Sequence, residues 1–315
     1  MNYSKIDFHA HYLSPGYKHF LKTQFNDMGD GVKTPEYSID LTLETMDKTN
    51  IDYSVISISS PHINTGEMNS TIELAAEVNN YAAEQQRKYP KQIGFLASLP
   101  LPHIEASLAT IELALTEQHA TGFTLPTNSR GVYLGDPLLD PIMESLNEHH
   151  AIVALHPNEP GKYDTKIAGQ IPTPIMEFFF DTTRTVLNML QNGIFVRYPH
   201  INFIIPHAGA VLPIIASRVK LAQVLNPDLT DEQVDIMAVM RSQYFDVAGI
   251  VLPQQLPVLL DLVDQDKLLY ASDTPYTPTK FVISLAEQLE QTGILSDAVK
   301  QKMFKTNAYR LLNLE

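Results

Sequence analysis

Eight short apolar runs recur along this chain, and longer amphipathic segments separate them. Each run is rich in Val, Ile, Leu or Phe, which is typical of parallel strands buried on both faces. The intervening segments, such as 41–50, 72–89 and 107–119, repeat apolar residues at intervals of three and four, as amphipathic helices do. We therefore expect strands at 5–11, 53–59, 92–100, 121–127, 151–157, 201–209, 243–249 and 267–275.

Eight strands, each followed by a helix, predict a TIM (β/α)8 barrel. The chain has 315 residues, of which 44% are hydrophobic, and this length suits a single barrel domain over residues 1–315. The alternative is an open, doubly wound α/β sheet. Such sheets usually contain fewer strands, and the sequence has neither a GxGxxG nor a Walker A nucleotide loop.

Two segments between the predicted elements are longer than ordinary loops. Residues 12–40 follow the first predicted strand, and residues 158–176 follow the fifth. Long loops in a compact domain tend to be functional, and loops after barrel strands cover the catalytic face. We expect both segments to act as lids over a site, with simple decoration of the barrel rim as the alternative.

Polar residues gather at the C-terminal ends of four predicted strands. His9 and His11 end the first strand and, being two residues apart, point to the same face. His156, His207 and Asp273 end the fifth, sixth and eighth strands. In a barrel these ends surround one mouth, where catalytic sites are built. Each residue alone could be structural, but three or four nitrogens and one carboxylate together suit Zn²⁺, Fe²⁺ or Mn²⁺.

Other polar residues near these strands receive different interpretations. Asp7 is expected to be a buried structural carboxylate rather than a metal ligand. His62 follows the second strand, and we expect it on the surface, although it could line the site. His149 and His150 precede the fifth strand, so they belong to the opposite face of the barrel and are assigned no role.

The composition excludes several kinds of function. The chain has no cysteine, which excludes disulfides, thiolate metal sites and a cysteine nucleophile. The formal net charge of -14 argues against binding to nucleic acid or an anionic membrane through bulk charge. The opening residues lack the pattern of a secretory signal, and no apolar run is long enough to cross a bilayer, so we expect a cytoplasmic protein.

Four motifs, DFHAH, LHP, PHAGA and ASDTP, occur in this order and resemble those of the amidohydrolase superfamily. Within it, nearly the whole chain is similar to the branch of aminocarboxymuconate-semialdehyde decarboxylase. Stretches such as SISSP, GFLASLPLP and TNAYRLLNL look closest to the methylsalicylate decarboxylase subgroup, which acts on small aromatic acids.

The resemblance implies a mononuclear site with His9, His11, His156 and Asp273 as metal ligands, with Zn favoured over Mn or Fe. His207 would lie beside the metal as a general acid or base, although Asp273 could deliver the proton instead. Binuclear members of the superfamily bridge two metals with a carboxylated lysine on the fourth strand. That strand, TGFTLPT, has no lysine here, so one metal is expected.

The resemblance also implies an arginine that reaches from a neighbouring subunit to hold a substrate carboxylate. Arg218 stands at the matching position, eleven residues after His207, and therefore implies a homodimer or larger assembly. A surface or interface ion pair is the alternative for this arginine. Ala210 occupies a position where relatives more often have glycine, which makes the turn after His207 less permissive. A lid arginine of the muconate enzyme has no counterpart, because the cations of residues 12–40 are Lys18, Lys22 and Lys33.

These features favour a non-oxidative decarboxylase that acts on a small aromatic or unsaturated carboxylic acid. The alternative is a metal-dependent hydrolase of an amide or lactone, because the same metal site could activate a water. A third interpretation is a barrel that binds a small acid without turnover. With no tryptophan in the chain, the candidates for the pocket walls are Tyr12, Phe25, Met28 and Phe178.

Overall fold

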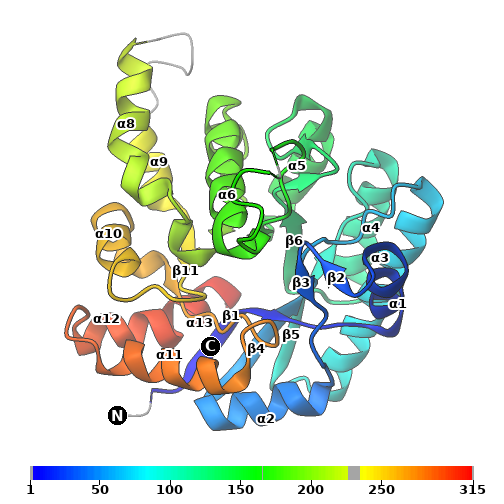
Figure 1. Ribbon diagram of the computed structural model, residues 1–315, viewed down its shortest axis with the longest axis horizontal. Coiled ribbons are helices and arrows are strands. Elements are labelled where there is room, and N and C mark those ends of the chain that lie inside the picture. Colours follow the sequence, from blue (N-terminus) through cyan, green and yellow to red (C-terminus); the bar gives the residue numbers. More distant parts are fainter. Residues whose placement is uncertain (1–2, 165, 226–234, 314–315) are drawn as a thin grey trace.

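The computed structural model describes residues 3–164, 166–225 and 235–313, and its central feature is a sheet of eight parallel strands surrounded by helices (Figure 1). The strands follow one another around the sheet in chain order, which confirms the predicted TIM barrel. They are β1 (Lys5–His11), β4 (Ile51–Ser57), β5 (Ile93–Ser98), β6 (Gly122–Pro126), β9 (Ile152–His156), β10 (Asn202–Ile205), β11 (Tyr244–Asp246) and β12 (Leu268–Leu269).

Hydrogen bonds between β1 and the segment after β12 close the barrel. Phe8 N donates to Tyr270 O at 3.1 Å, and His11 N donates to Thr274 O at 2.7 Å. Between them, Asp273 N donates to His9 O at 2.7 Å. The seam of the barrel therefore places the first and last site residues of the chain side by side.

Each predicted strand overlaps one observed strand; six are shorter than predicted, and the last three are shortened most. The predicted runs 201–209, 243–249 and 267–275 leave the strand conformation early. His207 and Asp273 lie just beyond β10 and β12 and have φ angles of 54° and 57°. A positive φ is incompatible with a strand, so these two side chains project from turns at the barrel mouth.

Thirteen helices lie among the described residues, and most of them follow a barrel strand. Local signals set their ends: Ser38 accepts from Leu41 N at the start of α2, and Asn50 ends that helix in the left-handed conformation. Helices α8 and α9 extend away from the barrel (Figure 1). The helices are α1 (Pro15–Phe25), α2 (Ile39–Thr49), α3 (Met68–Lys88), α4 (Ile104–Thr116), α5 (Asp140–Glu148), α6 (Thr173–Gln191), α7 (Ile194–Arg197), α8 (Leu212–Leu225), α9 (Ile236–Ser242), α10 (Gln255–Leu262), α11 (Thr279–Gln291), α12 (Asp297–Gln301) and α13 (Asn307–Leu312).

The first predicted lid, residues 12–40, is more ordered than a long loop. Ser14 caps α1, with Pro15 in its first turn, so the Ser-Pro-Gly sequence starts a helix rather than forming only a turn. A short hairpin of β2 (Met28–Gly29) and β3 (Val32–Lys33) follows that helix. The second lid runs from β9 to α6, which begins at Thr173.

The core fills the barrel and the layer between its strands and helices. Tyr12, a candidate pocket residue, belongs to this core, because it is fully buried and its hydroxyl donates to Val78 O. Searched over the residues that the structure describes, the helices include none with the length and apolar character of a membrane span.

Candidate metal centre

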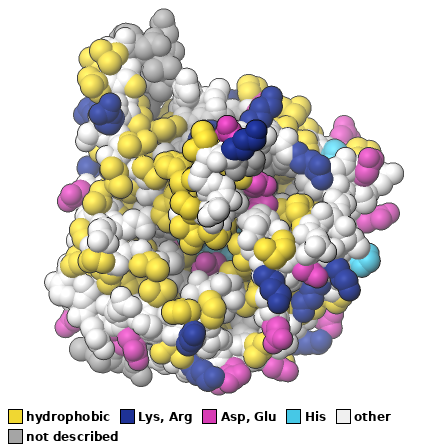
Figure 2. Space-filling view, in the orientation of Figure 1, with side chains coloured by type: hydrophobic (Ala, Val, Ile, Leu, Met, Phe, Trp, Pro, Cys, Tyr) yellow, Lys and Arg dark blue, Asp and Glu magenta, His cyan; other side chains and the backbone are white. Residues whose placement is uncertain are grey.

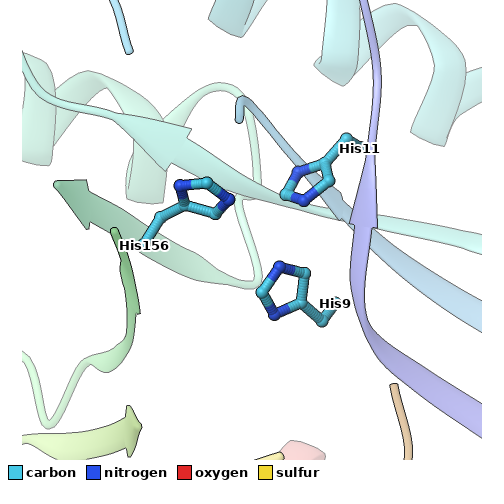
Figure 3. A group of neighbouring side chains, drawn as sticks. All are labelled: His9, His11 and His156. Atoms are coloured by element: carbon cyan, nitrogen blue, oxygen red, sulfur yellow. The ribbon is translucent and has the colours of Figure 1, made fainter. Parts of the chain in front are cut away.

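Three histidine rings converge inside the mouth of the barrel (Figure 3). His9 and His11 project from β1, and His156 projects from the opposite side of the opening, at the end of β9. Their ring centroids lie 4.8 to 5.5 Å apart. One ligand atom from each ring lies within 4.8 Å of those of the other two. The alternation of β1 and the chain order of the barrel therefore bring these three residues together.

Hydrogen bonds at Nδ1 orient two of the rings. His9 Nδ1 lies 2.8 Å from Asp246 Oδ2, and His156 Nδ1 lies 2.8 Å from Pro157 O. Both acceptors require a proton on Nδ1, so in the neutral ring the lone pair lies on Nε2. Within the described part of the chain, the buried Nε2 atoms of His9 and His11 have no hydrogen-bond partner. Buried polar atoms normally have partners, so these lone pairs are suited to a cation.

Asp273 and His207 complete the cluster. Asp273 Oδ1 lies 3.3 Å from His11 Nε2 and 3.9 Å from His9 Nε2. Burial acts to raise the pKa of Asp273, but its close contact with His11 Nε2 and the charge of His9 lower it to about 2. Ligand atoms of His9, His207 and Asp273 also lie within 4.8 Å of one another. The structure thus brings together all five residues that the sequence placed at strand ends.

This donor set fits one divalent cation. Imidazole nitrogens with a carboxylate are the ligands that Zn²⁺, Mn²⁺ and Fe²⁺ share, and the ligand atoms of His9, His11 and His156 lie within 4.8 Å of one another. The fourth barrel strand, β6, has no lysine, in keeping with the expected single metal.

The turn that carries His207 has an unusual backbone. Four consecutive residues, 207–210, have positive φ, and Ala210 has φ 56° and ψ -120°. Non-glycine residues in such regions are strained, as the sequence predicted for Ala210. Gln255 Nε2 donates to His207 O at 2.9 Å and to Ala210 O at 3.3 Å. These bonds, with that from His207 N to Asp246 Oδ1 at 2.9 Å, hold the histidine over the site.

Asp246 is a site residue that the sequence analysis missed. It ends β11, and its two oxygens bind different partners: Oδ2 contacts His9, and Oδ1 accepts from the backbone of His207 and Ala248. Burial acts to raise the pKa of Asp246, but the charge of His9 lowers it. The sequence YFDVAG carried a usable signal, because it ends a predicted strand in an acidic residue as LLYASD does.

The predictions for Asp7 and His62 had opposite outcomes. Asp7 is the structural carboxylate that was expected, since it accepts from His9 N and from both N and Oγ of Ser272. His62 was expected on the surface, which is wrong, because only 2% of it is exposed. The loop after β4 turns inward, and burial lowers the pKa of His62 to about 3. Its position after the second strand, on the catalytic face, was the available signal.

Aromatic side chains surround the cluster. Phe178 lies 6.3 Å from the His156 ring, Phe179 stacks on His207 at 6.1 Å, and Tyr276 contacts His11 at 5.6 Å between centroids. Of the candidate wall residues, Phe178 is thus near the cluster, whereas Met28 is exposed. Figure 2 shows a recess on this face with histidine and acidic side chains at its base.

Arg218 lies on α8 with an exposed side chain. This helix projects from the barrel (Figure 1). The contact of Arg218 with the substrate of a neighbouring subunit stays a prediction.

A family model described as amidohydrolase matches residues 6–314, so the chain belongs to the amidohydrolase family. It is 28% identical to the 6-methylsalicylic acid decarboxylase of Penicillium expansum, over 95% of this chain and 93% of the relative. The predicted resemblance to the methylsalicylate decarboxylase subgroup is confirmed, and it supports an enzyme of the carboxy-lyase kind.

Two solved structures share the fold. The crystal structure of a protein called amidohydrolase II has a TM-score of 0.94 and 45% identity, covering 98% of this chain and all of that one. The 5-carboxyvanillate decarboxylase of Novosphingobium aromaticivorans, solved with manganese and 4-hydroxy-3-methoxy-5-nitrobenzoic acid, has a TM-score of 0.87. It is 19% identical, over 99% of this chain and 96% of that one.

Proposed function

We propose that this protein is a non-oxidative decarboxylase of a small aromatic or unsaturated carboxylic acid and depends on one divalent metal. The observation that carries the proposal is the convergence of unpartnered imidazole nitrogens and Asp273 at the mouth of an amidohydrolase barrel. The decarboxylase relatives favour release of CO₂ over the other chemistry of the family. A cytoplasmic location stays a prediction.

His9, His11, His156 and Asp273 would hold the metal, with Zn²⁺ as the first choice. The manganese in the 5-carboxyvanillate decarboxylase supports a divalent metal and keeps Mn²⁺ as the alternative. When bound, the metal supplies a template and Lewis acid for the substrate carboxylate and an adjacent hydroxyl.

The chain itself must deliver a proton. As the bond between the ring carbon and the carboxylate breaks, CO₂ leaves and the electron pair stays on the carbon, which then takes a proton from His207 or Asp273. Burial and the neighbouring charge of His9 lower the pKa of His207, so its protonated form is a stronger acid than a free imidazolium. Asp246 and Gln255 keep its backbone in place, and Phe179 covers one face of its ring.

We further propose that Arg218 reaches the substrate carboxylate of a neighbouring subunit in a homodimer. Helix α8 supports this arrangement, because it projects from the barrel and exposes Ile214, Leu221, Val224 and Leu225. Figure 2 shows hydrophobic side chains over this region. Exposed apolar patches of this kind mark protein interfaces.

The test is CO₂ release from a panel of hydroxybenzoates by the metal-loaded protein. We expect release with at least one acid. The His207→Ala variant should keep its metal and lose activity, whereas substitution of His9, His11, His156 or Asp273 should lower the metal content. Metal loss in His207→Ala would make that residue a ligand. Incorporation of ¹⁸O from water into an amide or lactone product, without CO₂ release, would replace the proposal with hydrolysis.

A further inference from the structure

A cavity of about 350 Å³ lies among the loops at the C-terminal ends of the barrel strands, and its lining does not include the residues of the candidate metal centre. The lid hairpin and the loops after β4, β5, β6 and β9 form its walls, and its volume suits a small molecule. It adjoins the metal centre through His156. Asn158, on one wall, is two residues from His156, and His62 N donates to Ser59 O, whose side-chain Oγ lies 3.4 Å from His156 Nε2.

Two polar side chains of this cavity have buried atoms without partners. Asn158 Nδ2 donates to Pro61 O at 3.2 Å and to Asn128 O at 3.1 Å, which fixes the orientation of the amide. Its Oδ1 is therefore an acceptor, and over residues 3–164, 166–225 and 235–313 it has no partner. Nε2 of His62, which is 2% exposed, likewise has no partner among the described residues.

Asp30 adds a carboxylate to these two groups. It follows Gly29 of the lid hairpin and is 5% exposed. Its Oδ2 accepts from Glu159 N at 2.9 Å, which joins the two lids, and the carboxylate lines the cavity. Burying a carboxylate is costly unless it is paired and hydrogen-bonded, so a further donor would stabilise this group.

The remaining polar walls are already engaged. Asn64 Nδ2 donates to Ser129 Oγ at 2.7 Å, and Ser129 Oγ donates to Leu101 O at 2.8 Å. Arg130 is exposed at the rim, with Nε 3.4 Å from Asn64 O. Phe25, one of the wall residues predicted from the sequence, supplies apolar surface with Leu99 and Leu101. The cavity thus combines apolar walls, which suit a ring, with the buried polar groups of Asp30, His62 and Asn158.

We propose that this cavity receives the substrate substituent that lies away from the reacting carboxylate, and that Asp30, His62 and Asn158 select a hydrogen-bond donor there. This inference rests on the proposed function and narrows its substrate class to aromatic acids with a second hydroxyl or amino group. A methyl group in that position leaves buried acceptors unpaired, which costs about 1–3 kcal/mol, or about 5- to 150-fold in affinity.

The test measures binding apart from catalysis. Calorimetry on the metal-loaded protein compares the three benzenediols with phenol and the matching cresols, which have no carboxylate to lose. We expect at least one benzenediol to bind about 10-fold or more tightly than its cresol. Asp30→Asn should reduce that preference at least about 5-fold, as should His62→Phe, which replaces the ring with an apolar one.

Asp27→Asn is the matched control. It makes the same carboxylate-to-amide change in the same lid, at a residue outside the described cavity lining. The preference of this variant for a benzenediol over the matching cresol should equal that of the unaltered protein. Equal binding of benzenediols and cresols, or an unchanged preference in both Asp30→Asn and His62→Phe, would overturn the inference.

Failure of this inference and failure of the proposed function give different results. If hydroxybenzoates release CO₂ but benzenediols and cresols bind alike, the cavity does not select donors and the decarboxylase proposal stands. If the preference is present and lost in Asp30→Asn while no acid releases CO₂, the donor-selecting cavity stands and the decarboxylase proposal fails.

Discussion

Strand β1 buries titratable side chains at both of its ends, and the two ends satisfy them differently. At the start, Lys5 Nζ donates to Tyr3 O, Thr49 O and Glu290 Oε1, so all three of its donors are used. At the end, Nε2 of His9 and of His11 has no hydrogen-bond partner in the portion of the chain that the structure describes. Folding alone provides hydrogen-bond partners for Lys5 at the first end, whereas the imidazole nitrogens at the second end require a ligand.

The largest expected difference between the two ends is in metal binding. In His11→Leu, the metal content should fall from about one ion per chain to near zero. The melting temperature of the metal-free protein should change by only a few degrees, because the substitution removes Nε2, which has no hydrogen-bond partner among the described residues, and only one long contact, that of Nδ1 with Ser57 Oγ at 3.3 Å. Metal analysis and calorimetry of the metal-free forms test this. Retained metal, or a metal-free variant that unfolds, would contradict the comparison.

At the other end of β1, Lys5→Met should lower the free energy of unfolding by about 3–5 kcal/mol, because it leaves the carboxylate of Glu290 buried without its cation. Denaturant unfolding measures the loss, and Glu290→Gln added to Lys5→Met should recover part of it. Lys305→Met is the control: its pair with Asp52 is more exposed, so its loss should stay below about 1 kcal/mol. Equal losses of unfolding free energy in Lys5→Met and Lys305→Met would show that burial of the Lys5 ion pair makes no difference.

Asp246→Asn should have an intermediate effect, because the carboxylate orients His9 and also holds the backbone of His207. We expect metal affinity to fall about 10- to 100-fold, as for other residues that orient metal-binding histidines. Titration with a competing chelator measures the change. Asp261→Asn, an exposed change of the same type on α10, should leave the affinity unaltered. An unchanged affinity in Asp246→Asn would show that His9 needs no such partner.

The smallest effect concerns Asp30, whose pKa burial raises from 3.8 to about 7. The folded state disfavours the ionised carboxylate, so this group lowers stability progressively as the pH rises from about 4 to about 7. Asp30→Asn should therefore raise the melting temperature by a few degrees at pH 8 and change it little at pH 4. Thermal unfolding at both pH values tests this, and an equal shift at both would rule out the ionisation as the cause. A stabilised variant with weaker ligand selection would mark a residue kept for function.

Much of the candidate site could be predicted because it follows from local pattern. The spacing of His9 and His11 puts both on one face of a strand, and the chain order of barrel strands brings His156, His207 and Asp273 to the same mouth. Asp246 also lies at the C-terminal end of a barrel strand, so the same reasoning could have identified it. His62 and Asp30 could not be placed this way, because they lie in loops, where no period of the sequence sets the direction of a side chain.

The sequence by itself determined the barrel, its strand order and the group of histidines with Asp273, because apolar periodicity and the period of two in a strand are properties of the chain. Tertiary structure alone decided which polar atoms find partners. Closure of β12 on β1, the inward turn after β4 and the contact between the lids depend on packing between distant segments. That packing gives Lys5 its three acceptors and leaves the imidazole nitrogens at the other end of the same strand for a ligand.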